Sequence, residues 1–84
     1  DYSLVKLENS RRALSRGLIE VSAARQRLEA QRDQLSLSIS GYEKQAQAAV
    51  AAGHDDLARI ALHREQDMEA RRAELEADIA QLSR

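Results

Sequence analysis

The fold of this chain is decided by residues 51–57, which read Ala-Ala-Gly-His-Asp-Asp-Leu. Gly53 suits the left-handed backbone conformation that often follows the last turn of a helix. Asp55 can cap a following helix, and Asp56 suits the positive N-terminal end of that helix. The chain has no proline, and its two other glycines lie inside a segment whose apolar residues recur at regular intervals. Residues 51–57 therefore predict a single turn between two helices.

The segment before the turn carries a heptad repeat of apolar residues. One row, in steps of seven, is Leu7, Leu14, Val21, Leu28, Leu35, Tyr42 and Ala49. The row three residues earlier mixes apolar residues with arginines and ends at the turn: Leu4, Arg11, Leu18, Arg25, Arg32, Ile39, Ala46 and Gly53. Two such rows form the seam of a coiled coil, and arginine stems can lie along it with their heads in water. We therefore expect one helix over about residues 2–52.

The segment after the turn has a different apparent period. Its expected inner face is Leu57, Ala61, Arg64, Met68, Arg72, Leu75, Ile79 and Leu82. Leu57, Met68 and Ile79 are eleven residues apart, a repeat typical of helices that supercoil little or slightly to the right. We expect a second helix over about residues 55–83, with the turn at residues 53–54.

A short loop between two long helices predicts that they pack as antiparallel neighbours. Folding the chain about the turn forms four opposed pairs: Ala46 with Ala61, Ile39 with Met68, Leu35 with Arg72, and Leu28 with Ile79. It also brings Glu43 near Arg64 as an ion pair between the arms. The expected fold is all-α, an antiparallel two-helix coiled-coil hairpin with unequal arms that forms one unit over residues 1–84.

The first arm is longer than the second by about twenty residues. This N-terminal overhang (residues 4–21) still carries the apolar stripe Leu4, Leu7, Leu14, Leu18 and Val21. An uncovered stripe of this kind predicts contact with another chain or with a C-terminal continuation of the second arm. Because the chain starts without an initiator Met, we expect it to be an excised fragment of a longer protein.

The composition disfavours several classes of function. Charged residues make up 32% of the chain, with a net charge of −1, and there is no cysteine. No apolar run reaches the roughly 18 residues that span a bilayer.

A two-helix hairpin offers no cleft to shift the pKa values of its carboxylates, so we expect no enzyme and no cofactor. His63 and Asp67 share a helix face but have no third metal ligand there, so no metal site is expected.

Basic residues form one small cluster, made of Lys6, Arg11, Arg12 and Arg16, which Glu8 interrupts. A weak contact with an acidic partner or a lipid is one interpretation, and a solvated helix face is the other. The alternative function that we consider is a nucleic-acid-binding arm, such as the helical hairpin of a tRNA synthetase. Such an arm would need a continuous basic stripe, whereas acidic residues interleave throughout this chain.

Three segments carry a resemblance to a known family. They are residues 27–31 (Arg-Leu-Glu-Ala-Gln), residues 42–46 (Tyr-Glu-Lys-Gln-Ala) and residues 48–62 (Ala-Ala-Val-Ala-Ala-Gly-His-Asp-Asp-Leu-Ala-Arg-Ile-Ala-Leu). In this order and spacing they resemble the phage-shock protein A family, which includes the vesicle-inducing protein in plastids. Tyr42 stands where many relatives have Trp, and Asp55 where many have Glu.

The resemblance implies the coiled-coil hairpin of a bacterial membrane-stress scaffold related to the ESCRT-III proteins. Such scaffolds are cytoplasmic and peripheral at the inner face of the cell membrane, where they self-assemble. Some also bind and inhibit an AAA+ transcription activator, which makes them transcription regulators. The family inserts into the membrane through an amphipathic N-terminal helix and assembles through further C-terminal helices, and we expect both to lie outside this fragment.

The resemblance also implies a site at the tip of the hairpin, where a neighbouring subunit's helix crosses. The residues carried over to this site are Gly53, Asp55, Asp56, Leu57, Ala58 and Arg59. The other interpretation is that Gly53 and Asp55 only cap helices. Leu57 and Ala58 are the stronger candidates, because small residues around the tip let another helix approach closely.

Overall fold

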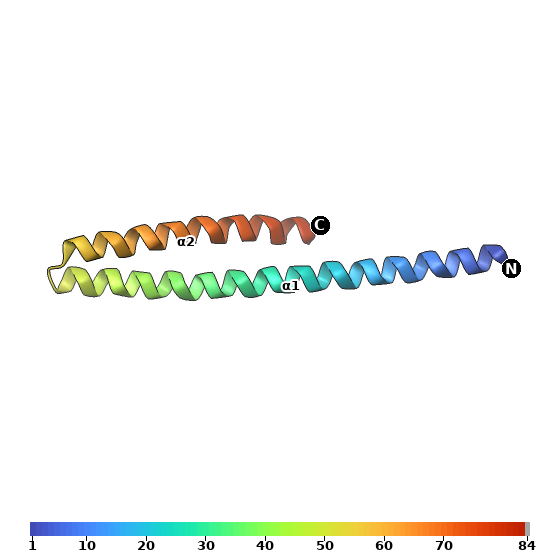
Figure 1. Ribbon diagram of the computed structural model, residues 1–84, viewed down its shortest axis with the longest axis horizontal. Helices are drawn as coiled ribbons and strands as arrows, with labels where there is room; N and C mark the ends of the chain where they lie inside the picture. Colours follow the sequence, from blue (N-terminus) through green and yellow to red (C-terminus); the bar gives the residue numbers. More distant parts are fainter. Residues whose placement is uncertain (84) are drawn as a thin grey trace.

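The computed structural model describes residues 1–83 as two helices, α1 (Tyr2–Ala51) and α2 (Asp55–Leu82). They lie side by side and antiparallel, joined by one turn, and α1 continues well past the end of α2 (Figure 1). The molecule is a rod of 78 × 14 × 13 Å. The all-α hairpin with unequal arms is thereby confirmed.

α1 is one uninterrupted helix of 50 residues. Its N-terminus is capped by Asp1, whose carboxylate accepts a hydrogen bond from the backbone N–H of Ser3 at 3.1 Å. Gly17 and Gly41 lie within the helix without breaking it. The seam residues therefore keep one heptad phase along the whole helix, from the overhang to the turn.

The turn depends on the backbone of Gly53, which has a φ of +78°. In this conformation the N–H of His54 donates to the carbonyl of Ala49 at 2.8 Å, and the N–H of Gly53 donates to that of Val50 at 3.0 Å. These bonds satisfy carbonyls that the end of α1 would otherwise leave unpaired. The predicted role of Gly53 as the residue that ends the first helix is confirmed.

The start of α2 differs from expectation in one detail. His54, not Asp55, stands at the N-cap position, and its side chain makes no capping hydrogen bond. Asp55 and Asp56 both lie in the first turn of the helix. There their carboxylates favour the positive end of the helix dipole without acting as caps.

The core lies between the two helices and changes in size along the hairpin. Near the turn the buried residues are Ala46, Ala58 and Ala61, while farther along they are Ile39 and Ile79. Small side chains near the turn let the helices approach as closely as a three-residue connection requires. Farther from the turn, the turn no longer limits the distance between the helices, and the larger isoleucines fill the wider space.

The inner face of α2 differs from the expected one, and its period is a heptad rather than eleven residues. The residues of α2 that are buried or half-buried are Ala58, Ala61, Glu65, Met68, Arg72, Leu75, Ile79 and Leu82. Their spacing alternates between three and four, which is the spacing of a coiled-coil seam. Leu57 and Arg64 were predicted on this face and instead lie exposed. Ala58 and Glu65 take their places, because a leucine at the first contact beyond the turn would push the helices apart.

The same rotation of α2 removes the predicted ion pair between Glu43 and Arg64, which is not formed in the part of the chain that the structure describes. One hydrogen bond between the helices bears on the predicted register, and it lies one residue from an expected pair. Arg72, which was expected opposite Leu35, donates from Nη1 to the Oγ of the adjacent Ser36 at 3.2 Å.

Candidate interaction surfaces

The N-terminal overhang is a single helix with no second helix beside it among residues 1–83 (Figure 1). Its predicted stripe is exposed: Leu4 66%, Leu7 67%, Leu14 72%, Leu18 72% and Val21 43%. Tyr2, Val5 and Ile19 are also exposed but lie off the stripe. An apolar row of this length is unusual on a protein surface that meets only water, and it indicates a contact surface.

The stripe borders a shallow groove in the middle of the overhang. The groove is lined by Ser10, Ala13, Leu14, Gly17, Leu18 and Val21. Gly17 has no side chain, and nothing lies within 4 Å of the position that a Cβ would take there. No side chain projects from the helix at this position beside the leucines, so another helix could approach closely there.

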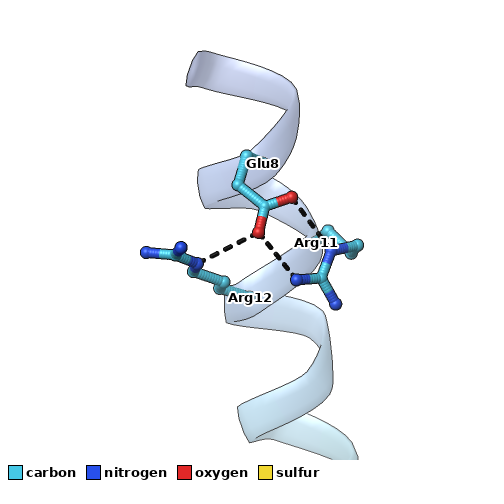
Figure 2. A network of polar contacts seen from close by, with 3 residues as sticks. All are labelled: Glu8, Arg11 and Arg12. Carbon is cyan, nitrogen blue, oxygen red and sulfur yellow. Dashed lines mark hydrogen bonds and ion pairs between the residues drawn. The ribbon is translucent and has the colours of Figure 1, made fainter. Parts of the chain in front are cut away.

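Two of the four basic residues of the overhang cluster, Arg11 and Arg12, are paired with Glu8 within the helix. Glu8 accepts two hydrogen bonds from Arg11, at 3.0 Å from Nε and 2.7 Å from Nη2, and a third from Nε of Arg12 at 3.1 Å (Figure 2). The Arg11 hydrogen bond, which outweighs a slight desolvation and is assisted by Arg12, holds the pKa of the Glu8 carboxyl below its ordinary value. The same carboxylate raises the pKa of Arg11. Glu8 thus offsets one of the four positive charges of the cluster.

The tip carries two apolar grooves. One is lined by Ala46, Gln47, Val50, Ala51 and Leu62. The other is lined by Gln45, Ala48, Ala49, Ala52, His54, Leu57, Ile60, Ala61 and Arg64. Each contains residues of both helices, so each exists only because the hairpin closes. Their large apolar side chains are about half exposed, with Leu57 at 52% and Ile60 at 48%.

The six residues predicted for the tip separate into three groups. Leu57 lines the second of the two grooves, together with alanines of α1. Gly53, Asp55, Asp56 and Arg59 are exposed around the turn. Ala58 is only 4% exposed and packs between the helices, so its side chain cannot reach a partner while the hairpin is closed.

Sequence reasoning missed Val50, Ile60 and Leu62 at the tip, all of which are exposed. The signal that could have found them is their position off the heptad seam. Val50 lies off the seam that the heptad rows of α1 already define. Ile60 and Leu62 point away from the core once Ala58 and Ala61 are assigned to the seam, so finding these two required the correct rotation of α2.

Residues 1–83 contain neither a cluster of metal ligands nor a membrane-spanning helix. No group of three or more His, Asp or Glu side chains is placed to hold a metal ion. Neither α1 nor α2 contains a stretch that is long and apolar enough to cross a membrane.

Comparisons with known proteins found no match to this chain among family models, curated proteins or solved structures.

Proposed function

We propose that this chain is a helix–helix interaction module, the coiled-coil hairpin of a membrane-stress scaffold similar to phage-shock protein A. The observation that carries the proposal is that the rod leaves apolar surface uncovered at both ends, on the overhang and at the tip. The heptad seam holds the hairpin together, which leaves these two surfaces free to bind other helices.

The tip is the proposed site for a neighbouring subunit in self-assembly, or for an AAA+ transcription activator. Leu57 and Ile60 supply apolar area in its groove. The alanines that line the same groove, Ala48, Ala49 and Ala52, have short side chains that leave room for another helix. Apolar anchors beside small residues suit the close approach of a crossing helix. In this proposal the scaffold works in the cytoplasm at the inner face of the bacterial cell membrane.

The support from the sequence is the tip string at residues 48–62 together with its two companion segments. In the structure, this string forms the end of α1, the turn and the start of α2. The most specific part of the resemblance therefore coincides with one of the two uncovered surfaces.

The proposal is tested by Leu57→Glu in the intact protein. A carboxylate there would have to be desolvated in a closely packed contact, which is costly, whereas in the free hairpin it meets water. We expect Leu57→Glu to abolish higher-order assembly or inhibition of the activator while helicity is kept.

Leu37→Glu is the matched control, because Leu37 is 68% exposed and lies on neither proposed surface. It should leave assembly and inhibition unchanged. Rings or rods of normal yield from Leu57→Glu, together with normal inhibition, would show that the tip is only a turn.

A further inference from the structure

One side of the hairpin, here named the groove side, carries two grooves in line. Beside the tip groove that contains Leu57, another lies farther from the turn, between α1 and α2. Both are bordered by the same two rows of residues, which are spaced alternately by three and four positions. The α1 row includes Gln31, Gln34, Ser38, Gly41, Gln45 and Ala48, and the α2 row continues from Leu57 as Ile60, Arg64, Asp67, Arg71, Glu74 and Asp78.

The two rows of the groove side differ in charge. The α1 row is uncharged, whereas the α2 row alternates in sign at Arg64, Asp67, Arg71 and Glu74. All four charged side chains are exposed, and none of them forms an ion pair in the part of the chain that the structure describes. The alternating charges are therefore available to a molecule that lies along the grooves.

We infer that the groove side binds the groove side of a second copy of this chain, with the two hairpins antiparallel and related by a two-fold axis. In this dimer α2 lies along α2 of the copy, and α1 lies along α1 of the copy. The inference deepens the proposed function, on which it rests, by naming the partner and the direction of one self-assembly contact.

The α2 row is complementary to itself when it is reversed. With the two-fold axis midway between Asp67 and Arg71, Asp67 faces Arg71 of the copy, and Arg64 faces Glu74 of the copy. Each of these ion pairs occurs twice by symmetry. Asp78 lies one helical turn beyond Glu74, so Arg64 of the copy lies between two carboxylates. Charge pairs of this kind beside a helix–helix contact determine which helices associate and in which direction.

The same axis suits the α1 row. In the register of the hydrogen bond that joins α1 to α2, the axis passes between Ser38 and Gly41. Ser38 then faces Gly41 of the copy, and Gln34 faces Gln45 of the copy, where the two amides can hydrogen-bond to each other. Nothing lies within 4 Å of the position that a Cβ would take at Gly41. The two α1 helices can therefore approach most closely at the axis, because their separation depends on the side chains at the contact.

The opposite side of the hairpin is not complementary to itself. Apart from Arg59 beside the turn, the charged residues of its two rows are all acidic: Asp33, Glu43, Glu69 and Glu76. A reversed contact through that side would bring carboxylates together, which opposes association. The charge pattern therefore favours the groove side. The tip groove on the opposite side, which contains Val50 and Leu62, stays open for a further partner.

The area of the contact is that of a stable complex. Because the axis passes near the middle of α2, the copies overlap along its 28 residues, a length of about 42 Å. Two helices side by side, each about 10 Å across, give roughly 800 Å² on each copy. Stable protein–protein interfaces bury about this area on each partner.

The mass of the unmodified chain, measured by light scattering during gel filtration, tests whether two copies associate. We expect twice the 9.4 kDa of one chain. Asp67→Arg places two arginines opposite each other and should raise the dissociation constant of the dimer by about tenfold or more. Glu69→Arg makes the same change of charge at an exposed position on the opposite side and should leave the dimer intact. A monomer of the unmodified chain at millimolar concentration, or equal effects of the two variants, would overturn the inference.

Restoring the opposed charges tests the pairing itself. Arg71→Glu alone should also dissociate the dimer, because it places two carboxylates opposite each other. A mixture of Asp67→Arg chains and Arg71→Glu chains should form a mixed dimer, since each reversed charge then faces its opposite. The double variant, whose net charge equals that of the unmodified chain, should form a dimer by itself. Single variants that dissociate at unchanged helicity, without recovery in the mixture or the double variant, would refute the antiparallel pairing.

Cross-linking tests the α1 contact, because the chain has no cysteine of its own. Ser38→Cys lies next to the axis and should be joined to its copy by a short thiol cross-linker. Ser40→Cys is exposed on the opposite side and should not be joined. Efficient linking of Ser40→Cys, or no linking of Ser38→Cys, would place the contact elsewhere and overturn the proposal.

Failure of the dimer is distinguishable from failure of the proposed tip site. A monomeric chain, with assembly of the intact protein that still requires Leu57, would refute the contact between groove sides and leave the tip site standing. A dimer that responds to the charge variants as expected, with assembly that tolerates Leu57→Glu, would support the contact and refute the tip site.

Discussion

Arg72 donates a hydrogen bond from Nη1 to the Oγ of Ser36 at 3.2 Å, across 36 positions of sequence. Within residues 1–83 it is the one side-chain hydrogen bond that joins α1 to α2. Apolar contacts have no preferred direction, whereas a hydrogen bond requires its donor and acceptor to lie at particular positions. A directed bond between two half-buried residues favours one register over the others.

The Ser36–Arg72 bond should therefore appear as a coupling free energy in a double-mutant cycle. Using Ser36→Ala and Arg72→Met at fixed protein concentration, we expect a coupling of about 0.5–1.5 kcal/mol in the free energy of unfolding. Ser40→Ala is the control, because Ser40 is exposed on α1 and makes no such bond. Its effect should add to that of Arg72→Met within about 0.3 kcal/mol. Equal coupling for both serines would show that the bond does not form in solution.

Ile39 is the largest buried side chain of α1 and was predicted to face Met68, which is half-buried. Ile39→Ala should lower the free energy of unfolding by about 2–4 kcal/mol, because it removes apolar contact and leaves a cavity. Gln47→Ala, at an exposed position of the same helix, should change it little. Thermal or urea unfolding followed by circular dichroism measures both. Coincident unfolding curves would mean that the core lies elsewhere.

Gly53 and Gly41 should respond oppositely to alanine, although a Cβ would meet nothing within 4 Å at either position. Gly53 has a φ of +78°, where a Cβ clashes with its own backbone, so Gly53→Ala should destabilise the hairpin by roughly 1–2 kcal/mol. Gly41 is helical, so Gly41→Ala should stabilise by about 0.5–1 kcal/mol through helix propensity. The midpoints of urea unfolding give both signs. A loss of stability from Gly41→Ala would contradict this prediction, because it would mean that the added methyl group meets a neighbour that the structure does not place there.

The Glu8 carboxyl should titrate at a lower pH than an ordinary glutamate, because hydrogen bonds from Arg11, and to a lesser degree Arg12, lower its pKa in the folded state. A lowered folded-state pKa stabilises the fold above the ordinary glutamate pKa, and this contribution disappears as the pH falls through the lowered value. An NMR titration of the side-chain carboxyl measures the shift.

Arg11→Gln should return the pKa of Glu8 toward its ordinary value, since Arg11 makes the largest contribution to the shift. Arg16→Gln removes a nearby positive charge that makes no hydrogen bond to Glu8 and should leave the titration nearly unchanged. Similar shifts from both variants would mean that the general positive charge of the cluster, and not the paired geometry of Figure 2, sets the pKa.

Much of the hairpin follows from local sequence. The heptad row through Leu28, Leu35 and Tyr42 determines which side of α1 packs, because its period leaves only one continuous apolar face. The helix bounds expected at about 2–52 and 55–83 differ from the observed Tyr2–Ala51 and Asp55–Leu82 by one residue at the end of each helix. Gly53 marks the turn, since it alone among the glycines stands between two periodic segments.

The face of α2 was decided only by tertiary packing. Its sequence offers two nearly equal stripes, one through Leu57 and Arg64 and one through Ala58 and Glu65. Ranking residues by hydrophobicity favours the first stripe, but the narrow space between the helices beside the turn favours the smaller residue. The helix therefore buries Ala58 and leaves Leu57 outside.

That choice also determined the candidate site at the tip. The sequence by itself established two helices, one turn at Gly53 and an apolar overhang, because propensity and periodicity act within a few residues of the chain. The packing of α2 on α1 decided which apolar side chains remain for a partner, namely Leu57, Ile60 and Leu62 on α2. The physical reason is that the distance between two helices is set by the side chains that both contribute, which the pattern of either helix alone does not contain.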